Sequence, residues 1–349
     1  MAGFNPASNS TSNLPQSRVI YYDKRFIENL KAQTPFVRCA ERRELPLNSG
    51  NQLELFMYNT FGANTVQVSE GTVPSGISAS VGTTTATIGE YADYANFSSL
   101  SLATAIDPVV ENVGRELSYR LGQSLSAITR AVADGANSVD ASVRVSITGG
   151  TSLALANIRA QVQSLAGRAV QPFNEAEALM AGVIHPFAVG DLLNDSSNNS
   201  AIDTLKHTVP GLQRMDDLVS IDLADTLEFP ASGVAFFQSN LVTLTTAYQG
   251  SAAGVVAYRT YIFGKDGVIA IRLGGRGDNA IEDGNWRNIE CNIVQNAPLS
   301  VADPSGLIPG WTSYRVHYTA SLPPDTTQRL RTIDATSAIR ESSLTKKRE

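Results

Sequence analysis

Residues 50–94 read GNQLELFMYNTFGANTVQVSEGTVPSGISASVGTTTATIGEYADY. Over residues 52–58 the side chains alternate with the period of a β-strand, and residues 81–88 are rich in threonine and β-branched side chains. Turns are expected between these two runs, at Gly71, Pro74 and Gly76. The pattern predicts a long two-stranded arm. A lone two-stranded ribbon is marginally stable in water, so this arm needs a surface to lie on.

Charge is distributed unevenly around this arm. Residues 44–114 contain no lysine or arginine but seven acids, whereas residues 18–43 hold seven basic side chains. One interpretation is an acidic arm that lies across a basic surface of another subunit, since complementary patches set register and encounter rate. A solubilising acidic surface explains the same pattern, and both interpretations remain open. The candidate interface residues are Glu54, Glu70, Gly71, Pro74, Gly76, Glu90 and Asp93 on the arm, and Arg25, Arg38, Arg42 and Arg43 on the basic side.

The composition is that of a folded soluble protein. The chain has 349 residues, 42% hydrophobic and 17% charged, with a net charge of -6. That charge argues against a general nucleic-acid binder, although it does not exclude a protein that surrounds DNA without gripping it. Two cysteines make no disulfide framework, and no apolar run is long enough to predict a membrane span.

The clearest helix is predicted over Asp107–Ala133. Asp107 is a suitable N-cap, Pro108 suits the first helical position, and apolar residues recur every three or four positions. Gly135 is placed to end this helix. Alternating elements follow: a helix over 152–168, and strands over 178–184, 218–229, 234–238, 255–263, 268–273 and 311–322. A short helix is also predicted before the arm, over 19–31, and Pro35 limits it.

Catalytic and metal-binding patterns are missing from the sequence. His185, His207 and His317 lie far apart, and none has a second ligand at helical spacing. An acidic cluster could coordinate a hard cation, but its spacing favours solvated carboxylates: Asp216, Asp217, Asp222 and Asp225. No nucleophile elbow or phosphate-binding loop is present. We therefore expect no enzyme, no cofactor and no metal site.

Several short stretches, taken in order, resemble one protein family. They are residues 21–25 (YYDKR), 70–74 (EGTVP), 107–108 (DP), 185–187 (HPF) followed by 191–192 (DL), 263–266 (FGKD) and 310–311 (GW). Their order is similar to that in the major capsid proteins of tailed bacteriophages, whose fold is called Hong-Kong-97-like. The resemblance covers about residues 19–335.

The resemblance implies an α+β Hong-Kong-97-like major capsid fold, divided along the chain. Its parts would be an N-terminal arm (1–47), an extended loop (48–98), a peripheral domain with a long spine helix (99–148), an axial domain (149–299), and a return to the peripheral domain with a C-terminal tail (300–349).

The implied function is structural. Many copies, as pentamers and hexamers, would form an icosahedral shell around double-stranded DNA without sequence-specific binding and without a membrane. Portal proteins and separate scaffolding or decoration proteins would be partners. The shell would assemble in the host cytoplasm and become the virion capsid. Some relatives cross-link through a lysine on the extended loop; this loop has none, so we expect no such cross-link.

Two alternatives remain at this stage. An encapsulin-type nanocompartment would have the same fold but enclose enzyme cargo. A β-rich hydrolase or carbohydrate-binding domain is the other, and the absence of a catalytic pattern counts against it.

Overall fold

The structure is a computed structural model of the whole chain. It describes residues 34–58, 61, 64–65, 67–68, 71, 73, 76–104, 109–147, 152–173, 179–194, 226–229, 233–245, 256–274, 289–295, 308, 310–324 and 329–337. The predicted strand over 218–229 is described only from residue 226, and the predicted helix over residues 19–31 lies outside the described residues.

A five-stranded sheet forms one half of the fold. Its strands are β1 (Glu41–Leu45), β4 (Gly89–Phe97), β11 (Ile269–Leu273), β12 (Ile289–Gln295) and β13 (Gly310–Ser321). The long β13 is the centre: it pairs antiparallel with β4, β12 and β11, and β1 joins the sheet parallel to β11. Alternate side chains of β13 are buried, which confirms the strand predicted over 311–322.

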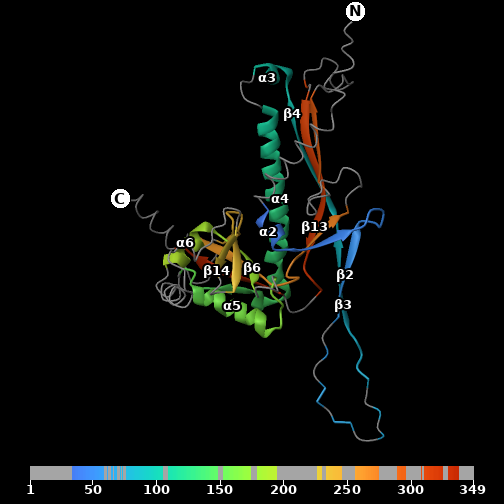
Figure 1. The fold of residues 1–349 in the computed structure, drawn as a ribbon, viewed down its shortest axis with the longest axis vertical. Helices are drawn as coiled ribbons and strands as arrows, with labels where there is room; N and C mark the ends of the chain where they lie inside the picture. Colours follow the sequence, from blue (N-terminus) through green and yellow to red (C-terminus); the bar gives the residue numbers. More distant parts are fainter. Residues whose placement is uncertain are drawn as a thin grey trace, which may run out of the picture.

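Helix α4 (Val109–Val139) runs along one face of this sheet (Figure 1). Its apolar stripe, which includes the buried Leu117, Leu121 and Leu125, packs into the same core as Tyr314 and Val316 of β13. The predicted long helix is therefore confirmed; the predicted cap at Asp107 and Pro108 lies outside the described residues.

The predicted end of this helix at Gly135 is wrong, because α4 continues to Val139. A glycine inside a helix costs about 1 kcal/mol relative to alanine. Ala133 and Ala136 flank Gly135 and are both buried in the core, so packing on both sides offsets that cost.

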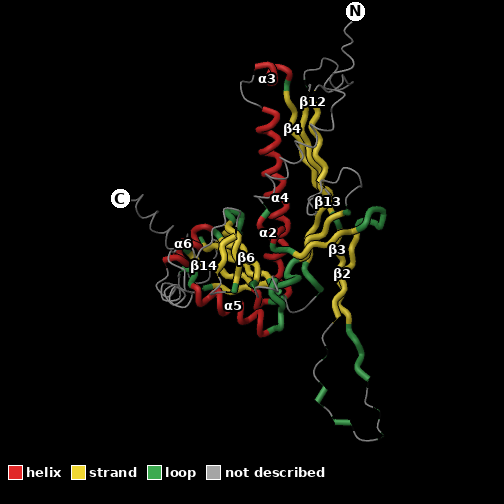
Figure 2. The backbone as a smooth tube through the Cα atoms, viewed as in Figure 1, coloured by secondary structure: helices red, strands yellow, loops and turns green. Residues whose placement is uncertain are grey.

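A seven-stranded sheet forms the second half. In spatial order its strands are β5 (Arg144–Ser146), β14 (Leu330–Thr336), β10 (Ala257–Phe263), β6 (Met180–Ile184), β8 (Val234–Gln238) and β7 (Thr226–Phe229), with β9 (Leu244–Thr245) also paired to β10. Helices α5 (Leu155–Gly167) and α6 (Pro186–Asn194) share a core with this sheet (Figure 2). That core contains no residue of α4, whose contacts lie on the other side of the sheet.

The two sheets are not consecutive along the chain. β11 and β12, inside the range predicted for the axial domain, pair with β13. β14, inside the range predicted to return to the peripheral domain, pairs with β10 instead. The chain thus crosses three times between the two halves, after β4, after β10 and after β13. Three short helices complete the described part of the fold: α2 (Pro35–Arg38), α3 (Ser99–Thr104) and η3 (Ala141–Val143).

The predicted arm is a separate antiparallel ribbon of β2 (Gln52–Tyr58) and β3 (Val81–Thr87). Its base lies on β11, where Leu55 and Ala86 share a small core with Ile269 and Ile271. Gly82 of β3 also allows a close approach to the segment after β13, because a Cβ there would lie 2.4 Å from the Pro324 carbonyl oxygen. The ribbon therefore has the surface it needs at its base, while its far end projects from the body (Figure 1). Among the described helices, none combines the length and the apolar character that crossing a membrane requires.

Candidate assembly surface

The ribbon has two different faces. Leu53, Leu55 and Met57 point to the protein, and Leu55 is only 2% exposed. The residues between them point outward, and Phe56 and Tyr58 are 59% and 72% exposed. Because side chains alternate along a strand, the sequence that buries the leucines necessarily presents these two aromatic rings to solvent.

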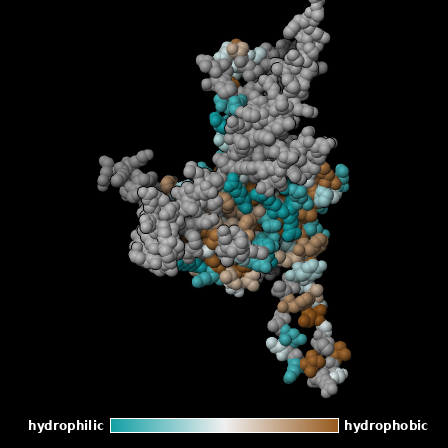
Figure 3. Space-filling view, viewed as in Figure 1, coloured by the Kyte–Doolittle hydropathy of each residue, from teal (hydrophilic) through white to brown (hydrophobic). Residues whose placement is uncertain are grey.

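The aromatic face continues onto the partner strand and the loop beyond it. Val81 lies directly opposite Tyr58 in the ribbon register and is 45% exposed. The described residues of the loop include four more large exposed apolar side chains: Phe61, Val68, Val73 and Ile77. Figure 3 shows apolar residues along this projecting end. Exposed apolar surface of this extent on a projecting element is typical of a binding site for another protein.

Two of the predicted turn residues, Gly71 and Gly76, lie in the described part of the loop between β2 and β3. Gly71 has a backbone φ of +82°, a left-handed conformation that glycine adopts without strain. Gly76 is exposed, and no atom lies within 4 Å of where its Cβ would be. Glu70 and Pro74 lie outside the described residues.

Two of the predicted interface acids lie on β4 rather than on the ribbon, and both face basic groups of the same chain. Asp93 Oδ2 lies 2.8 Å from Arg120 Nη1 on α4. Glu90 Oε1 lies 3.8 Å from both Arg315 Nε and His317 Nε2 on β13. Of the predicted acids that the structure describes, Glu54 is the one on the outward face of the ribbon.

The predicted basic residues are also engaged within the chain. The Arg38 guanidinium lies over the Phe237 ring, 5.7 Å from its centroid. Burial, and then the neighbouring Arg272, lower the pKa of Arg42. Arg43 Nη2 lies 3.9 Å from Asp266 Oδ1. Arg25 lies outside the described residues. These arginines and the acids of the arm are not brought together in one chain, and their pairing between subunits stays a prediction.

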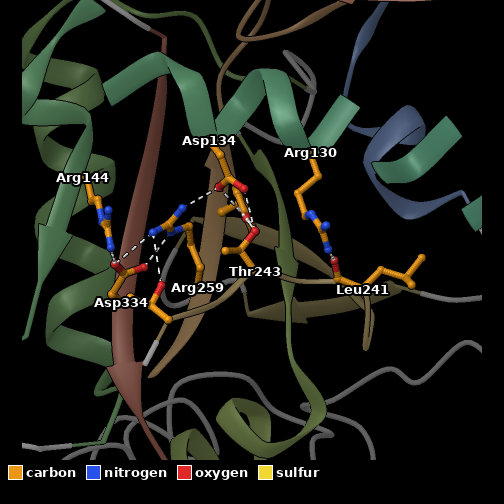
Figure 4. Close-up of polar contacts among 9 residues, drawn as sticks. Arg130, Asp134, Arg144, Leu241, Thr243, Arg259 and Asp334 are labelled. Atoms are coloured by element: carbon orange, nitrogen blue, oxygen red, sulfur yellow. Dashed lines mark hydrogen bonds and ion pairs between the residues drawn. The ribbon is translucent and has the colours of Figure 1, made fainter. Parts of the chain in front are cut away.

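A polar network with a buried centre joins α4 to the seven-stranded sheet (Figure 4). At its centre is Arg259 of β10, which donates from Nε to Asp334 at 2.7 Å and from Nη1 to Asp134 of α4 at 2.6 Å. Arg144 of β5 donates to the same Asp334 at 2.6 Å. Burial opposes the charge of Arg259, but the hydrogen bonds that it donates to both carboxylates outweigh this effect and raise the pKa of Arg259.

Further hydrogen bonds complete this network. Thr243 donates to Asp134 Oδ2 at 2.6 Å, and the Tyr261 hydroxyl lies 2.8 Å from Asp134 Oδ1. Arg130, one helical turn before Asp134, donates to the Leu241 carbonyl. Sequence patterns gave no signal for this network, since its members come from elements far apart in the chain.

The described residues contain no group of three His, Cys, Asp or Glu side chains placed to hold a metal. His185 stacks against Tyr258, with ring centroids 4.3 Å apart. Cys39 is buried, and burial raises the pKa of its thiol, which makes it a poor nucleophile. His207 and the acidic cluster from Asp216 to Asp225 lie outside the described residues.

Phe56 and Tyr58 are the site residues that the sequence interpretation missed. The signal was present, since both fall on the opposite side of the alternation from the buried Leu53 and Leu55. The prediction rested on the acidic charge of the arm, whereas Phe56 and Tyr58 are the large exposed side chains on this face of β2.

No protein-family profile matches this chain, and no curated protein sequence does. Solved structures do match it. The capsid structure of cyanophage P-SCSP1u is 12% identical, with 86% of each chain covered and a TM-score of 0.57. The capsid of Ralstonia phage GP4 is 12% identical over 86% of this chain and 87% of that chain, with a TM-score of 0.58. The cyanophage Pam1 capsid is 12% identical over 88% and 93%, with a TM-score of 0.54. The likeness confirms the resemblance seen in the sequence at the level of the fold: this chain has the fold of phage capsid proteins.

Proposed function

We propose that this protein is the major capsid protein of a tailed phage, a structural protein without enzymatic activity. Many copies form a closed icosahedral shell that encloses double-stranded DNA. The observation that carries the proposal is the projecting ribbon, whose outer face is aromatic and unpartnered within the described chain. A projecting element with an exposed apolar end suits a contact with another copy of the same chain.

On this proposal, we assign the parts of a Hong-Kong-97-like protomer to the following elements. The ribbon and its loop are the extended loop, and α4 is the spine helix of a peripheral domain built on the five-stranded sheet. The seven-stranded sheet with α5 and α6 is the axial domain, which packs around the five-fold and six-fold positions. Repeated head-to-tail contacts between such protomers close into pentamers and hexamers.

The contact of the ribbon with its neighbour is mainly apolar. Aromatic residues dominate the binding energy of many protein interfaces, and Phe56 and Tyr58 are the largest exposed side chains of the ribbon strands. Glu90 and Asp93 already face basic groups of their own chain, which leaves Glu54 and Glu70 as the acids for a basic surface of the neighbour. Charge then sets register, and burial of the aromatic face supplies affinity.

The surroundings of the shell follow from the same proposal. The acidic net charge of -6 suits a container that does not hold packaged DNA tightly. The shell forms in the host cytoplasm around a portal, with separate scaffolding or decoration proteins as partners. The sequence from 44 to 114 contains no lysine, so the shell is held together without lysine cross-links through this loop. A ladder of covalent oligomers on a denaturing gel of mature particles would contradict this.

A deletion of residues 70–76 tests the proposal. This deletion removes the far end of the loop and leaves β2, β3 and their packing on β11 intact, so the protomer is expected to keep its circular dichroism spectrum and melting temperature. Negative-stain microscopy is expected to show shells from the unmodified chain and none from the deletion.

The contents of the particles separate the remaining alternatives. Shells from infected cells that contain double-stranded DNA support the phage capsid. Shells that contain a co-purifying enzyme and no DNA indicate an encapsulin-type compartment. A chain that stays monomeric under every assembly condition contradicts the shell altogether.

A further inference from the structure

Helix α4 contacts both halves of the fold. Its backbone lies close to β13, β4 and α2, and one apolar core joins it both to β13 and to Tyr261 and Phe263 of β10. Toward the seven-stranded sheet, the side chains of Arg130 and Asp134 also form hydrogen bonds with Leu241 and Arg259 (Figure 4). Apolar contacts are non-directional, whereas hydrogen bonds require a defined angle and distance. These hydrogen bonds therefore add a directional constraint on the inclination of α4 against that sheet.

We call the hydrogen-bonded contact of α4 with the seven-stranded sheet, made by Arg130, Asp134 and Arg259, the polar joint. The geometry of Arg259 places it at the centre of this joint. Arg259 lies directly opposite Asp334 in the register of β10 and β14, and it binds that carboxylate with two nitrogens, at 2.7 Å and 3.2 Å. Its third nitrogen reaches Asp134 at 2.6 Å. Because the guanidinium group is planar and rigid, binding Asp334 bidentately leaves one direction for the bond to α4.

The centre of the network is shielded from water, and the network is balanced in charge. The side chains of Arg259 and Asp334 are 6% and 1% exposed, whereas those of Asp134 and Arg144 are 24% and 32% exposed, and together they make two cations and two anions. Water therefore competes little for the bonds between Arg259 and Asp334, which hold the guanidinium group in place for its bond to α4.

We propose that Arg259 is a positioning residue that fixes the inclination of α4 against the seven-stranded sheet. The core between the sheet, α5 and α6 contains no α4 residue among those that the structure describes, so that core does not depend on this bond. The inclination set by Arg259 determines the angle between the two halves of each subunit. If the proposed capsid function holds, on which this step rests, that angle determines the curvature of the shell.

The test uses the full-length chain before assembly. Spin labels are attached through noncanonical residues at the exposed Glu116 of α4 and Gln163 of α5, and the distance between them is measured by pulsed electron paramagnetic resonance. The unmodified chain is expected to give one narrow distribution. Arg259→Lys, which keeps the charge but loses the planar fork, and Asp134→Asn, which keeps the shape, are each expected to broaden it about twofold.

The control variant is Asp93→Asn, which removes an ion pair between α4 and its own sheet and is expected to leave the distribution unchanged. A narrow, unshifted distance in both joint variants overturns the proposal. Near-UV circular dichroism checks that both variants are folded. If Arg259→Lys does not fold, the distance distribution of Asp134→Asn decides the test.

The second readout is the diameter of shells formed by the same variants. Shells of mixed diameter from the joint variants, with uniform shells from Asp93→Asn, support the link to curvature; uniform shells of unchanged diameter contradict that link. A broadened distance in a chain that never forms shells supports the joint while contradicting the capsid function, so the two proposals fail separately.

Discussion

Asp93 on β4 forms an ion pair with Arg120 on α4, with 2.8 Å between Oδ2 and Nη1. This pair ties the helix to the sheet of the same protomer, so Asp93 is engaged before any subunit contact forms. Arg120 is 69% exposed, and exposed ion pairs contribute about 0.2–1 kcal/mol. We expect Asp93→Asn to lower the free energy of unfolding by an amount in that range, measured by urea denaturation at low salt.

The same substitution bears on the acidic arm. If Asp93 acts within the protomer, Asp93→Asn leaves the yield of shells unchanged at every salt concentration. A yield that falls sharply in this variant, with normal protomer stability, would return Asp93 to the interface between subunits.

Alternating positions of β2 give a matched pair of substitutions. Leu55 is 2% exposed and packs on Ile269 and Ile271, so Leu55→Ala is expected to destabilise the protomer by about 2–5 kcal/mol. Tyr58, on the other face and 72% exposed, is expected to give a change within about 0.5 kcal/mol when replaced by serine.

Shell assembly, unlike protomer stability, is expected to be sensitive to substitutions on the exposed face of β2. Tyr58→Ser and Phe56→Ser each remove an aromatic side chain from the contact with a neighbour, so shell formation should require a higher protein concentration, as measured by light scattering. Normal assembly of the double variant Phe56→Ser/Tyr58→Ser would contradict the assignment of this face as an interface.

Local patterns in the sequence predicted the elements that depend on neighbouring residues. The alternation over 52–58 and the apolar stripe of the long helix both follow from periodicity, and both are present in the structure. The extent of that helix beyond Gly135 was not predictable, because burial of Ala136 depends on tertiary packing.

Contacts between distant segments were beyond local reasoning. Glu90 and Asp93 belong to the acidic stretch by sequence, yet β4 leaves the ribbon and pairs with β13. The polar joint is a second case: Arg259 lies 125 residues from Asp134 and 75 from Asp334. Isolated Asp and Arg residues carry no periodic signal, so only the assembled sheets reveal their partnership.

Asp140 makes stability depend on acid pH. Its carboxylate accepts hydrogen bonds from the Ser142 backbone N–H at 2.9 Å and from Arg168 Nη1 at 2.7 Å. Burial opposes ionisation, but the hydrogen bonds from Ser142 and Arg168 outweigh it and lower the pKa of Asp140 from 3.8 to about 2. The group therefore stabilises the fold above about pH 4, and this contribution is lost as the pH falls through 2.

Asp140→Asn isolates that contribution. The asparagine oxygen can still accept from Ser142, but the ion pair with Arg168 is lost, so we expect a loss of roughly 1 kcal/mol at pH 7 after allowance for solvent screening. The difference in unfolding free energy between the two chains should shrink between pH 4 and pH 2. A difference that stays constant over this range would show that Asp140 acts through something other than its charge.

Tyr318 gives the corresponding prediction at alkaline pH. Its hydroxyl lies 2.6 Å from Thr129 Oγ1 of α4, and the side chain is buried. Burial raises the pKa of Tyr318 from 10 to about 12, because the phenolate is less well solvated in the core than in water. A pKa raised in the folded state means that stability is fully present below pH 10 and is lost as the pH rises toward 12.

Tyr318→Phe is expected to cost about 1 kcal/mol at neutral pH through loss of the hydrogen bond to Thr129, and that deficit should shrink above pH 10 as the unmodified chain weakens. Urea denaturation at several pH values measures both effects, with Tyr94→Phe, at a tyrosine that is 67% exposed, as the control that should leave stability unchanged. A deficit of Tyr318→Phe that is the same at pH 8 and at pH 11 would contradict the raised pKa of Tyr318, and no deficit at either pH would mean that apolar packing alone holds this contact between α4 and β13.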